Sequence, residues 1–483
     1  MMIRPHAPEK PPALAAGGLS LLLLLVAAMA RAGEPAAPVI TGPVAAPAAP
    51  GDASHDYPFY AAIEDLKSRG YIEQEFFIQG TANRYETPAA ENGKVIDGGH
   101  AYKTRLVVRR PLAANKFNGT VIVEWNNVTS GHDLDIDWYQ AHDYFMRSGY
   151  AWIGVTAQRI GVEALKVWNA KRYGSLDVTA GGSVMNDALS YDIFSDVART
   201  VRKPGSVDIL GGLKPQRVFA TGHSQSAARL GIYVNAVHPL NPVFDAVVLH
   251  GGGGKVRGDL GIKVWKLLSE TDVLNQAAQR QPDTDKFRTW EVAGDSHVDV
   301  QFIASSRELG RRDGNPVAPG SNPGGRGNTA TSSSGTPPSC ERPPYSHVPF
   351  YQVMDAAFDH LVRWVKDGTP PPAAPPIETT SVGPPAVFAR DKMGNALGGI
   401  RLAEHAVPTG VNTGQNSGAG FCRLYGSHED FPPATIAELY LNHAAYVAAV
   451  KRVTEENLKA GYILKPEADA TIAAAEKSPV GSR

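Results

Sequence analysis

The chain of 483 residues carries 47 Lys and Arg against 48 Asp and Glu, which gives a formal net charge of −1. This balance argues against a nucleic acid partner and against electrostatic binding to a membrane. Hydrophobic residues make up 43% of the chain, and 49 glycines and 37 prolines indicate a globular, loop-rich protein long enough for one large α/β unit.

The N-terminus has the pattern of a secretory signal peptide over residues 1–32. Positive charge precedes a short apolar core at 19–29, and a small-x-small cleavage site ends at Ala32. The core is too short to cross a membrane comfortably. We therefore expect cleavage after Ala32 and a secreted or periplasmic product without a membrane anchor. Residues 33–55, rich in Ala and Pro, should form a flexible mature N-terminus.

Short apolar, β-branched runs separated by polar turns predict the strands. They lie at 71–85, 103–109, 120–125, 150–156, 218–220, 244–250, 263–268 and 287–293. Helical patterns occupy 139–148, 190–202, a stretch opening at about 227, 349–366 and part of 429–460. This alternation predicts an α/β protein with a mostly parallel, doubly wound sheet. Ligands of such sheets bind beyond the carboxyl ends of the strands.

Three further segments complete the predicted organisation. Residues 158–187 lack clear periodicity and are a candidate cap over a pocket. Residues 311–339 are rich in Gly, Pro, Ser and Asn, which predicts a mobile surface insertion within a catalytic domain at 56–368. A proline-rich hinge then leads to a C-terminal extension at 377–475, which we expect to pack on the catalytic domain.

The pentapeptide Gly222-His223-Ser224-Gln225-Ser226 lies between a predicted strand and a predicted helix. A serine on so short a turn is held in a strained conformation, and its hydroxyl is exposed above the sheet. Only small residues fit two positions away, because strand and helix nearly touch there. The pattern matches the nucleophile elbow G-x-S-x-G, with Ser226 replacing the last glycine. Ser224 is therefore the predicted nucleophile.

A serine nucleophile needs a base, and the base needs an acid that orients it. The turn after strand 263–268 contains Glu270 and Asp272, and the turn after strand 287–293 contains His297. Serine, then a carboxylate, then histidine is the chain order of α/β-hydrolase triads. We expect His297 to be the base and Asp272 the acid, with Glu270 as the alternative acid. Asp295 should only shape the histidine turn.

The oxyanion of an acyl-transfer reaction needs two N–H donors. The backbone N–H of Gln225 is one candidate, and the loop after strand 120–125 should supply the other from Asn127 or Asn126. His250 ends a neighbouring strand and is a candidate pocket residue. No cofactor and no metal are expected.

Two smaller features carry expectations of their own. Asp133, Asp135 and Asp137 lack the glycine and the terminal glutamate of a calcium loop, so we expect a solvated acidic turn. Cys340 and Cys422 are the only cysteines. In an oxidising compartment we expect them to be joined, with two separate buried thiols as the alternative.

With these residues in place, the chain resembles the α/β-hydrolase superfamily, and more closely a bacterial branch described only as α/β-hydrolase domain-containing proteins. The motifs that carry the resemblance are Val123-Glu-Trp-Asn-Asn127, Gly222-His-Ser-Gln-Ser226, Ser269-Glu-Thr-Asp272, Gly294-Asp-Ser-His297 and Gly394-Asn-Ala-Leu-Gly-Gly-Ile-Arg401. The resemblance implies a serine hydrolase, and we expect an exported carboxylesterase acting on a small-molecule ester. The alternatives are an amidase, lactonase or peptidase with the same triad, or a catalytically silent binding protein.

Overall fold

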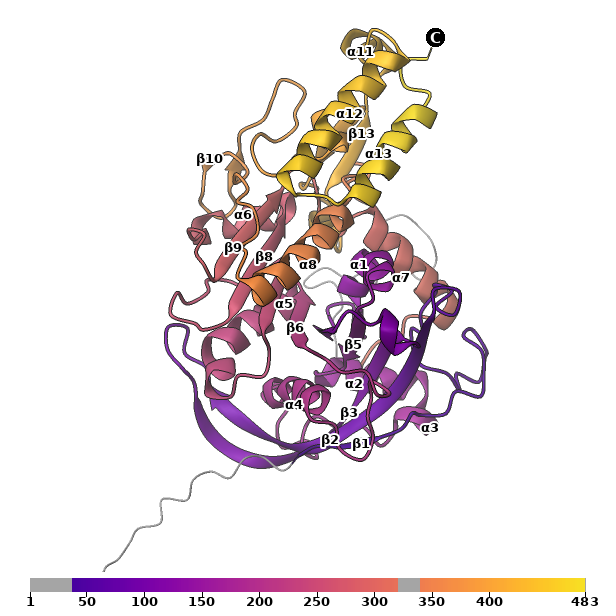
Figure 1. Cartoon of the computed structure of the whole chain (residues 1–483), viewed down its shortest axis with the longest axis vertical. Coiled ribbons are helices and arrows are strands. Elements are labelled where there is room, and N and C mark those ends of the chain that lie inside the picture. The colour runs from indigo at the N-terminus through magenta and orange to yellow at the C-terminus, as the bar shows by residue number, and fades with distance from the viewer. Residues whose placement is uncertain (1–36, 320–338, 483) are drawn as a thin grey trace, which may run out of the picture. The chain divides into compact units, whose positions relative to one another are not determined.

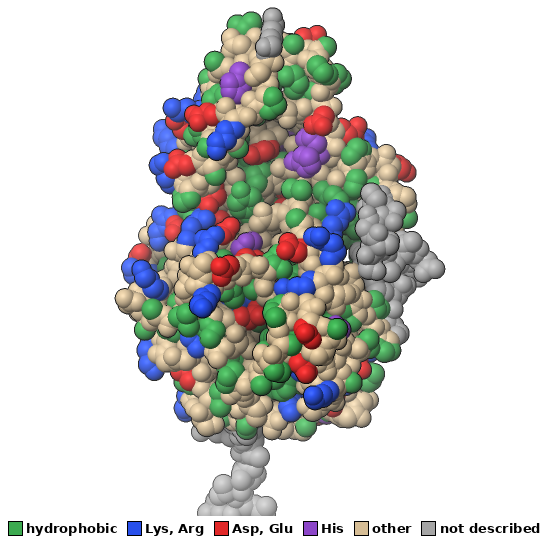
Figure 2. All heavy atoms as spheres, turned by 90° about the vertical axis from the view of Figure 1, so that its right-hand side faces the viewer, with side chains coloured by type: hydrophobic (Ala, Val, Ile, Leu, Met, Phe, Trp, Pro, Cys, Tyr) green, Lys and Arg blue, Asp and Glu red, His purple; other side chains and the backbone are tan. Residues whose placement is uncertain are grey.

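The computed structural model describes residues 37–319 and 339–482. The predicted signal peptide lies outside these residues, as do residues 33–36 and most of the predicted insertion. In the described part of the chain, no helix is both long enough and apolar enough to span a membrane. On the face drawn in Figure 2, acidic and basic side chains are interspersed, in keeping with the near-zero net charge.

A nine-stranded sheet forms the centre of the described chain. Its strands are β1 (Val39–Thr41), β2 (Tyr71–Glu86), β3 (Lys94–Pro111), β4 (Thr120–Trp125), β5 (Ala151–Val155), β6 (Arg217–His223), β7 (Ala246–His250), β8 (Lys263–Ser269) and β9 (Phe287–Val292). They are arranged in the order β1-β2-β3-β5-β4-β6-β7-β8-β9. The six strands β5, β4, β6, β7, β8 and β9 are parallel to one another. The pairs β1–β2, β2–β3 and β3–β5 are antiparallel. The predicted mostly parallel sheet is confirmed (Figure 1).

Helices follow most of the strands. They are α1 (Ile136–Arg147), α2 (Arg159–Trp168), α3 (Ala170–Tyr173), α4 (Ser190–Arg202), α5 (Gln225–Ile232), α6 (Glu270–Gln276), α7 (Val300–Asp313), α8 (Phe350–Asp367), α9 (Ala403–Ala406), α10 (Cys422–Tyr425), α11 (Pro433–Leu439), α12 (His443–Ala460) and α13 (Lys465–Lys477). Four short segments, η1 to η4, span Ala114–Lys116, Tyr233–Val237, His238–Leu240 and Ala277–Gln279. Two small hairpins pair β10 (Thr379–Ser381) with β11 (Val387–Phe388) and β12 (Gly410–Thr413) with β13 (Ser427–Asp430).

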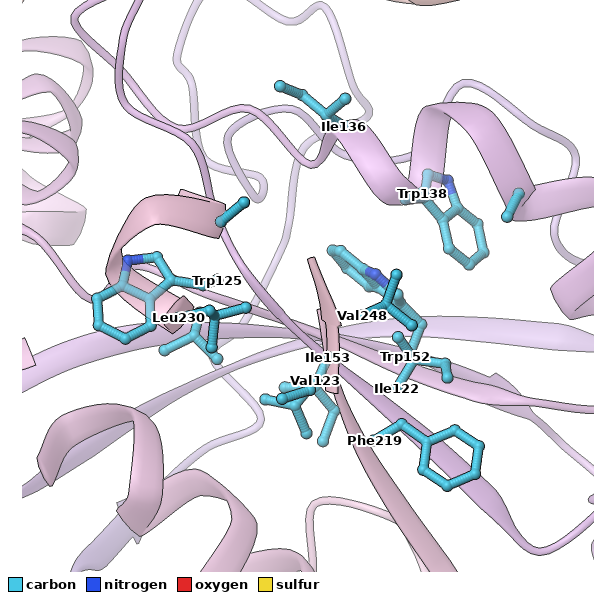
Figure 3. Close-up of a cluster of buried hydrophobic side chains, with 14 of the residues drawn as sticks. Ile122, Val123, Trp125, Ile136, Trp138, Trp152, Ile153, Phe219, Leu230 and Val248 are labelled. Carbon is cyan, nitrogen blue, oxygen red and sulfur yellow. The ribbon is translucent and has the colours of Figure 1, made fainter. Parts of the chain in front are cut away.

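Side chains of β4 alternate between two helical layers. Trp125 packs against Phe194 of α4, with ring centroids 4.9 Å apart. The preceding residue, Glu124, accepts hydrogen bonds from the backbone N–H groups of Asp137 and Trp138 at the start of α1. Successive residues of a strand point to opposite faces, so α4 and α1 cover opposite faces of the sheet. The sheet is therefore doubly wound, and Figure 3 shows the apolar side chains that fill this core.

The described part of the predicted flexible N-terminus is structured. Val39–Thr41 forms β1, which pairs antiparallel with Gln79, Ile78 and Phe77 of β2. The backbone N–H of Val44 also donates to the carbonyl of Glu75, at 2.7 Å. A three-residue strand is too short to show a periodic pattern. Its partner is also distant in the sequence, so local composition gave the wrong expectation for this stretch.

Helix α7 extends into the segment that was expected to be a mobile insertion. Asp313, its last residue, is 4% exposed and accepts hydrogen bonds from the Tyr57 hydroxyl at 2.8 Å and the Tyr60 N–H at 3.0 Å. The Arg312 guanidinium donates to the carbonyl of Ala61 at 2.6 Å. The start of the predicted insertion is therefore a buried anchor for the N-terminal segment around residue 60.

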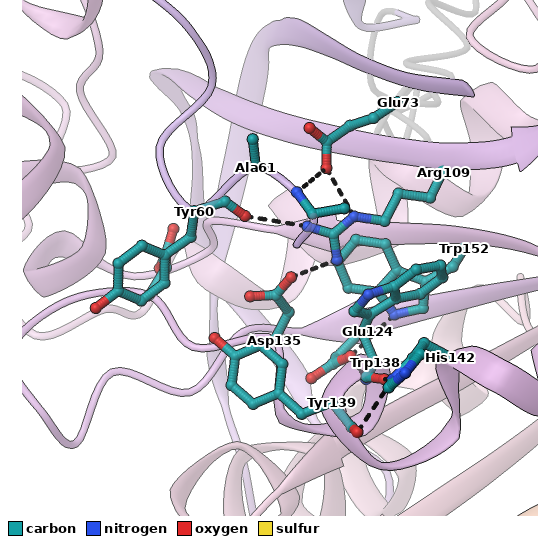
Figure 4. Close-up of polar contacts among 12 residues, drawn as sticks. Tyr60, Ala61, Glu73, Arg109, Glu124, Asp135, Trp138, Tyr139, His142 and Trp152 are labelled. Atoms are coloured by element: carbon teal, nitrogen blue, oxygen red, sulfur yellow. Dashed lines mark hydrogen bonds and ion pairs between the residues drawn. The ribbon is translucent and has the colours of Figure 1, made fainter. Parts of the chain in front are cut away.

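The three aspartates after β4 are buried, so the expected solvated acidic turn is wrong. Asp135 pairs with Nη1 of Arg109 at 2.5 Å, and Nε of Arg109 pairs with Glu73 at 2.8 Å. The Arg109 guanidinium lies over the rings of Trp138 and Trp152, at 4.7 and 4.6 Å (Figure 4). An arginine from β3, two strands away from β4 in the sheet, thus offsets the charge of Asp135. The local sequence around Asp135 gives no sign of this pairing.

The C-terminal region packs on the sheet at β9 and on α1. Ile400 forms a parallel bridge with Val292 at the end of β9, and the Trp290 indole donates to the carbonyl of Pro372 at 2.9 Å. On the helical side, Arg147 of α1 pairs with Glu467 of α13 at 2.6 Å. These contacts bring the residues after 400 to the end of the sheet where the candidate site lies.

Candidate active site

Ser224 occupies the turn between β6 and α5 with φ 60° and ψ −114°. A positive φ is rare for a residue with a Cβ atom and marks local strain. Strand and helix lie close together here, because a Cβ added to Gly222 would come within 2.9 Å of the Ser226 Cβ. The turn has the predicted elbow geometry, although α5 begins at Gln225, two residues before the predicted start at Ala227.

His297 is bonded to Asp272. Its ring Nδ1 lies 2.6 Å from Asp272 Oδ1. The other carboxylate oxygen, Oδ2, accepts from the backbone N–H and the hydroxyl of Ser269, at 2.8 and 2.6 Å, in a capping box at the start of α6. Burial acts to raise the pKa of Asp272, but the His297 ring and the bonds from Ser269 outweigh it and lower the pKa. Asp272 therefore presents a carboxylate to the ring.

Glu270, the alternative acid, has other partners. Its Oε2 accepts from the backbone N–H of Gly294 at 2.8 Å. Its Oε1 accepts from Arg390 at 2.7 Å and from the Thr413 hydroxyl at 2.8 Å. The side chain is fully buried and joins the turn at Gly294, which precedes His297, to the C-terminal region. The geometry thus separates the two carboxylates that the sequence left as alternatives.

Two further histidines, His223 and His250, lie next to His297 in a row of three rings. The His223 ring lies 4.2 Å from the His297 ring and 4.3 Å from the His250 ring, measured between centroids. Burial, with the nearby His297 and His250 rings, lowers the pKa of His223 well below its usual value, so this ring is neutral. His250 Nδ1 lies 2.7 Å from Asp137 Oδ1. His250 was expected to line the pocket, but it does not line the cavity and instead packs against the His223 ring.

Ser224 and His297 line the same cavity, which has a volume of about 60 Å³. The other lining residues come from the loop after β4, the start of α1, the end of β6, the turn that contains His297, α7 and the C-terminal region. They are Asn127, Thr129, Ser130, Leu134, Ile136, His223, Val298, Phe302, Ile303, Ser306, Phe421, Leu424 and Tyr425. Among the described residues, no hydrogen bond joins the Ser224 hydroxyl to the His297 ring. In an unliganded active site this bond is often long and tightens when substrate binds.

Residues 158–187, the predicted cap, do not contribute to this lining. Asp177 forms a bridge with Lys103 of β3, and Tyr173 of α3 donates to Glu75 of β2 at 2.8 Å. This segment therefore packs along β2 and β3. Only Gln158 reaches the elbow, where its side chain accepts from the Gln225 amide at 3.0 Å.

The candidate oxyanion donors differ in availability. Gln225 is the first residue of α5, so its backbone N–H has no partner within the helix. The backbone N–H groups of Asn126 and Asn127 are occupied, because they donate to the carbonyls of Val155 and Leu134 at 3.2 and 3.0 Å. The side chain of Asn127 lines the cavity and donates one N–H to the carbonyl of His223 at 2.9 Å. Its second N–H has no acceptor among the described residues.

Cys340 and Cys422 are joined by a disulfide, as expected, with their Cα atoms 5.4 Å apart. The bond connects the described segment that begins at residue 339 to α10, next to the cavity. Within residues 37–319 and 339–482, no group of three or more His, Cys, Asp or Glu side chains is arranged to hold a metal ion.

A comparison with curated proteins found no match. Among solved structures, the chain is similar to an α/β serine hydrolase without lid from Xanthomonas campestris, at 12% identity over 48% of this chain and 92% of that one, with a TM-score of 0.27. It is also similar to Est1E from Butyrivibrio proteoclasticus, at 10% identity over 43% and 92% of the two chains, with a TM-score of 0.26. For a glucuronoyl esterase from Teredinibacter turnerae the identity is 11% over 38% and 42%, with a TM-score of 0.22.

The family comparison covers far more of the chain than any of these structures. A family model described as the alpha/beta hydrolase domain matches residues 40–473. This span includes the central sheet except the first residue of β1, together with the elbow, both candidate acids, His297 and most of the C-terminal region. The protein therefore belongs to the α/β-hydrolase family.

Proposed function

We propose that the protein is a serine hydrolase that cleaves carboxylic esters. The observation that carries this proposal is the Asp272–His297 pair, bonded at 2.6 Å, in the same cavity wall as the strained Ser224. A serine on an elbow, a histidine and a carboxylate that orients it form the arrangement that performs acyl transfer on this fold.

In the proposed reaction, the Ser224 hydroxyl attacks the ester carbonyl while Nε2 of His297 takes its proton. Asp272 keeps the His297 tautomer with Nδ1 protonated and stabilises the imidazolium that forms. The intermediate collapses, the alcohol leaves with the proton from Nε2, and Ser224 carries the acyl group. Water then attacks the acyl-enzyme while His297 takes its proton. The bond between the acyl carbon and the Ser224 oxygen breaks, this oxygen receives the proton from Nε2, and the carboxylic acid is released.

Two N–H groups are the proposed oxyanion donors. One is the backbone N–H of Gln225, and the other is the second N–H of the Asn127 side chain. At Asn127 the proposed donor is the side chain, because the backbone N–H already donates to the carbonyl of Leu134. Preorganised donors of this kind typically contribute 10²- to 10³-fold to kcat, on the order of 3 kcal/mol.

The neutral state of His223 also favours the mechanism. A charged ring 4.2 Å from His297 would disfavour the imidazolium formed during catalysis. Because the pKa of His223 is lowered well below its usual value, the ring is uncharged where it packs against His297. His223 thus limits the orientation of His297 without placing a second charge beside it.

We further propose that the mature enzyme is exported. The disulfide between Cys340 and Cys422 is compatible with an oxidising compartment, where such bonds persist. The signal-peptide pattern that ends at Ala32 supports the same location.

The test is the turnover of p-nitrophenyl butyrate by the mature protein and by two matched serine variants. Ser224→Ala should lower kcat by about a millionfold, as loss of a triad nucleophile does. Ser226→Ala is the control, because Ser226 is fully buried in the same turn and its hydroxyl has no partner among the described residues. Ser224→Ala with kcat within tenfold of wild type, or a wild-type protein that turns over no ester, would refute the proposal.

A further inference from the structure

One wall of the cavity comes from the C-terminal extension. Phe421, Leu424 and Tyr425 line the same cavity as Ser224 and His297. The last two belong to α10, a helix of only four residues. A helix this short is not stable by itself, so its position depends on the contacts that hold it.

Three contacts hold this wall. The disulfide joins Cys422 to Cys340. The carbonyl of Leu424 accepts from the backbone N–H of Val298 at 3.0 Å, directly after His297. The carbonyl of Tyr425 accepts from the N–H of Tyr345 at 3.0 Å, and the two tyrosine rings lie 4.8 Å apart. The wall is therefore tied to the catalytic loop on one side and to the segment after Cys340 on the other.

The cavity next to this wall is small and uncharged. Its volume of about 60 Å³ corresponds to roughly four to six water-sized positions, enough for a short acyl chain. In the part of the chain that the structure describes, its lining contains no Lys, Arg, Asp or Glu, and apolar side chains dominate the wall and α7. A charged substituent would lose its hydration there without gaining a partner, which is costly.

We propose that residues 421–425, held in place by the Cys340–Cys422 bridge, are the specificity-determining wall of the ester site, and that they select esters of short, uncharged, apolar acids. This inference rests on the proposed esterase function. Phe421 and Leu424 limit the length of the acyl chain. The disulfide acts as a positioning element, because it fixes α10 against the loop that carries His297.

The test compares kcat/KM for p-nitrophenyl butyrate and p-nitrophenyl octanoate. In wild-type enzyme the butyrate is preferred. Phe421→Ala should raise the ratio of octanoate to butyrate kcat/KM by about tenfold or more. The reason is that each additional methylene that an apolar pocket accepts raises kcat/KM by about tenfold or more. The double variant Cys340→Ser, Cys422→Ser should shift the ratio in the same direction by releasing the wall. Phe421→Leu is a milder variant for use if Phe421→Ala does not fold.

Phe388→Ala is the matched control. Phe388 is 7% exposed and Phe421 is 8% exposed, so each substitution removes a similarly buried ring from the C-terminal region. Phe388 lies in β11 and does not line the cavity, so its variant should keep the wild-type ratio. An unchanged ratio in both Phe421 variants and in the disulfide variant, with an active wild-type enzyme, overturns this inference alone. A wild-type protein that hydrolyses neither ester overturns the proposed function as well.

Discussion

Replacing Asp272 by Asn and Glu270 by Gln separates the two roles that the structure gives to neighbouring carboxylates. Each change keeps the size of the side chain and removes its charge. Asp272 contacts the His297 ring at 2.6 Å, whereas Glu270 contacts Gly294, Arg390 and Thr413. The first variant should therefore affect chemistry and the second stability.

The expected effect of Asp272→Asn follows from its hydrogen bonds. Two donors of Ser269 face Oδ2, so the amide oxygen of Asn is held there and its NH₂ group faces His297 Nδ1. Nδ1 must then accept, which places the ring proton on Nε2. A protonated Nε2 cannot take the proton of Ser224. We expect kcat to fall by about 10⁴, the usual cost of the wrong tautomer in such a triad.

Glu270→Gln breaks a buried pair with Arg390 and leaves the amide facing at least one donor. A lost hydrogen bond to a charged group costs about 1.5–3 kcal/mol of stability. Because the side chain does not touch the ring, kcat should stay within about tenfold of wild type. The assay is steady-state kinetics on p-nitrophenyl butyrate, with thermal unfolding of both variants. A larger loss of kcat in Glu270→Gln than in Asp272→Asn would refute the assignment.

Substitutions at Arg109 and at Glu404 test how buried charges contribute to stability. Arg109→Ala leaves Asp135 and Glu73 without their buried partner and should lower the free energy of unfolding by about 3–5 kcal/mol in chemical denaturation. Arg110 is only half-buried, so Arg110→Ala is the control and should lower this free energy much less. Equal losses in the two variants would contradict the account. Burial raises the pKa of Glu404 from 4.5 to about 7. Between these pH values the folded protein keeps a proton that the unfolded chain has released. The free energy of unfolding therefore falls as the pH rises from about 4.5 to about 7. Glu404→Gln should therefore raise the melting temperature relative to wild type at pH 8 and leave it nearly unchanged at pH 4.5; an equal difference at both pH values would show that this titration is not responsible.

Much of the sheet and the order of the candidate triad could be predicted from local patterns. The apolar run of β4 and the amphipathic period of α4 match their predicted ranges to the residue. Parallel strands bring their carboxyl ends to one edge, so polar turns after β6, β8 and β9 had to meet there. That argument placed Ser224, Asp272 and His297 together.

The remainder depends on pairings between distant segments. Asp135 is buried because Arg109 reaches it from β3, and β1 is a strand because β2 offers an open edge. The Asn127 backbone is occupied by Leu134, which only the shape of the loop determines. The cavity wall at Phe421 is more than a hundred residues after His297, and only the fold of the C-terminal region brings the two together.

The central claim is that Ser224 is an activated nucleophile. The most direct measurement is the intact mass of the mature protein after reaction with a fluorophosphonate, followed by peptide mapping. We predict one equivalent of label, located on Ser224, with none on the Ser224→Ala variant and slow labelling of Asp272→Asn. No labelling of the folded wild-type protein, or a label on another serine that persists in Ser224→Ala, would contradict the account.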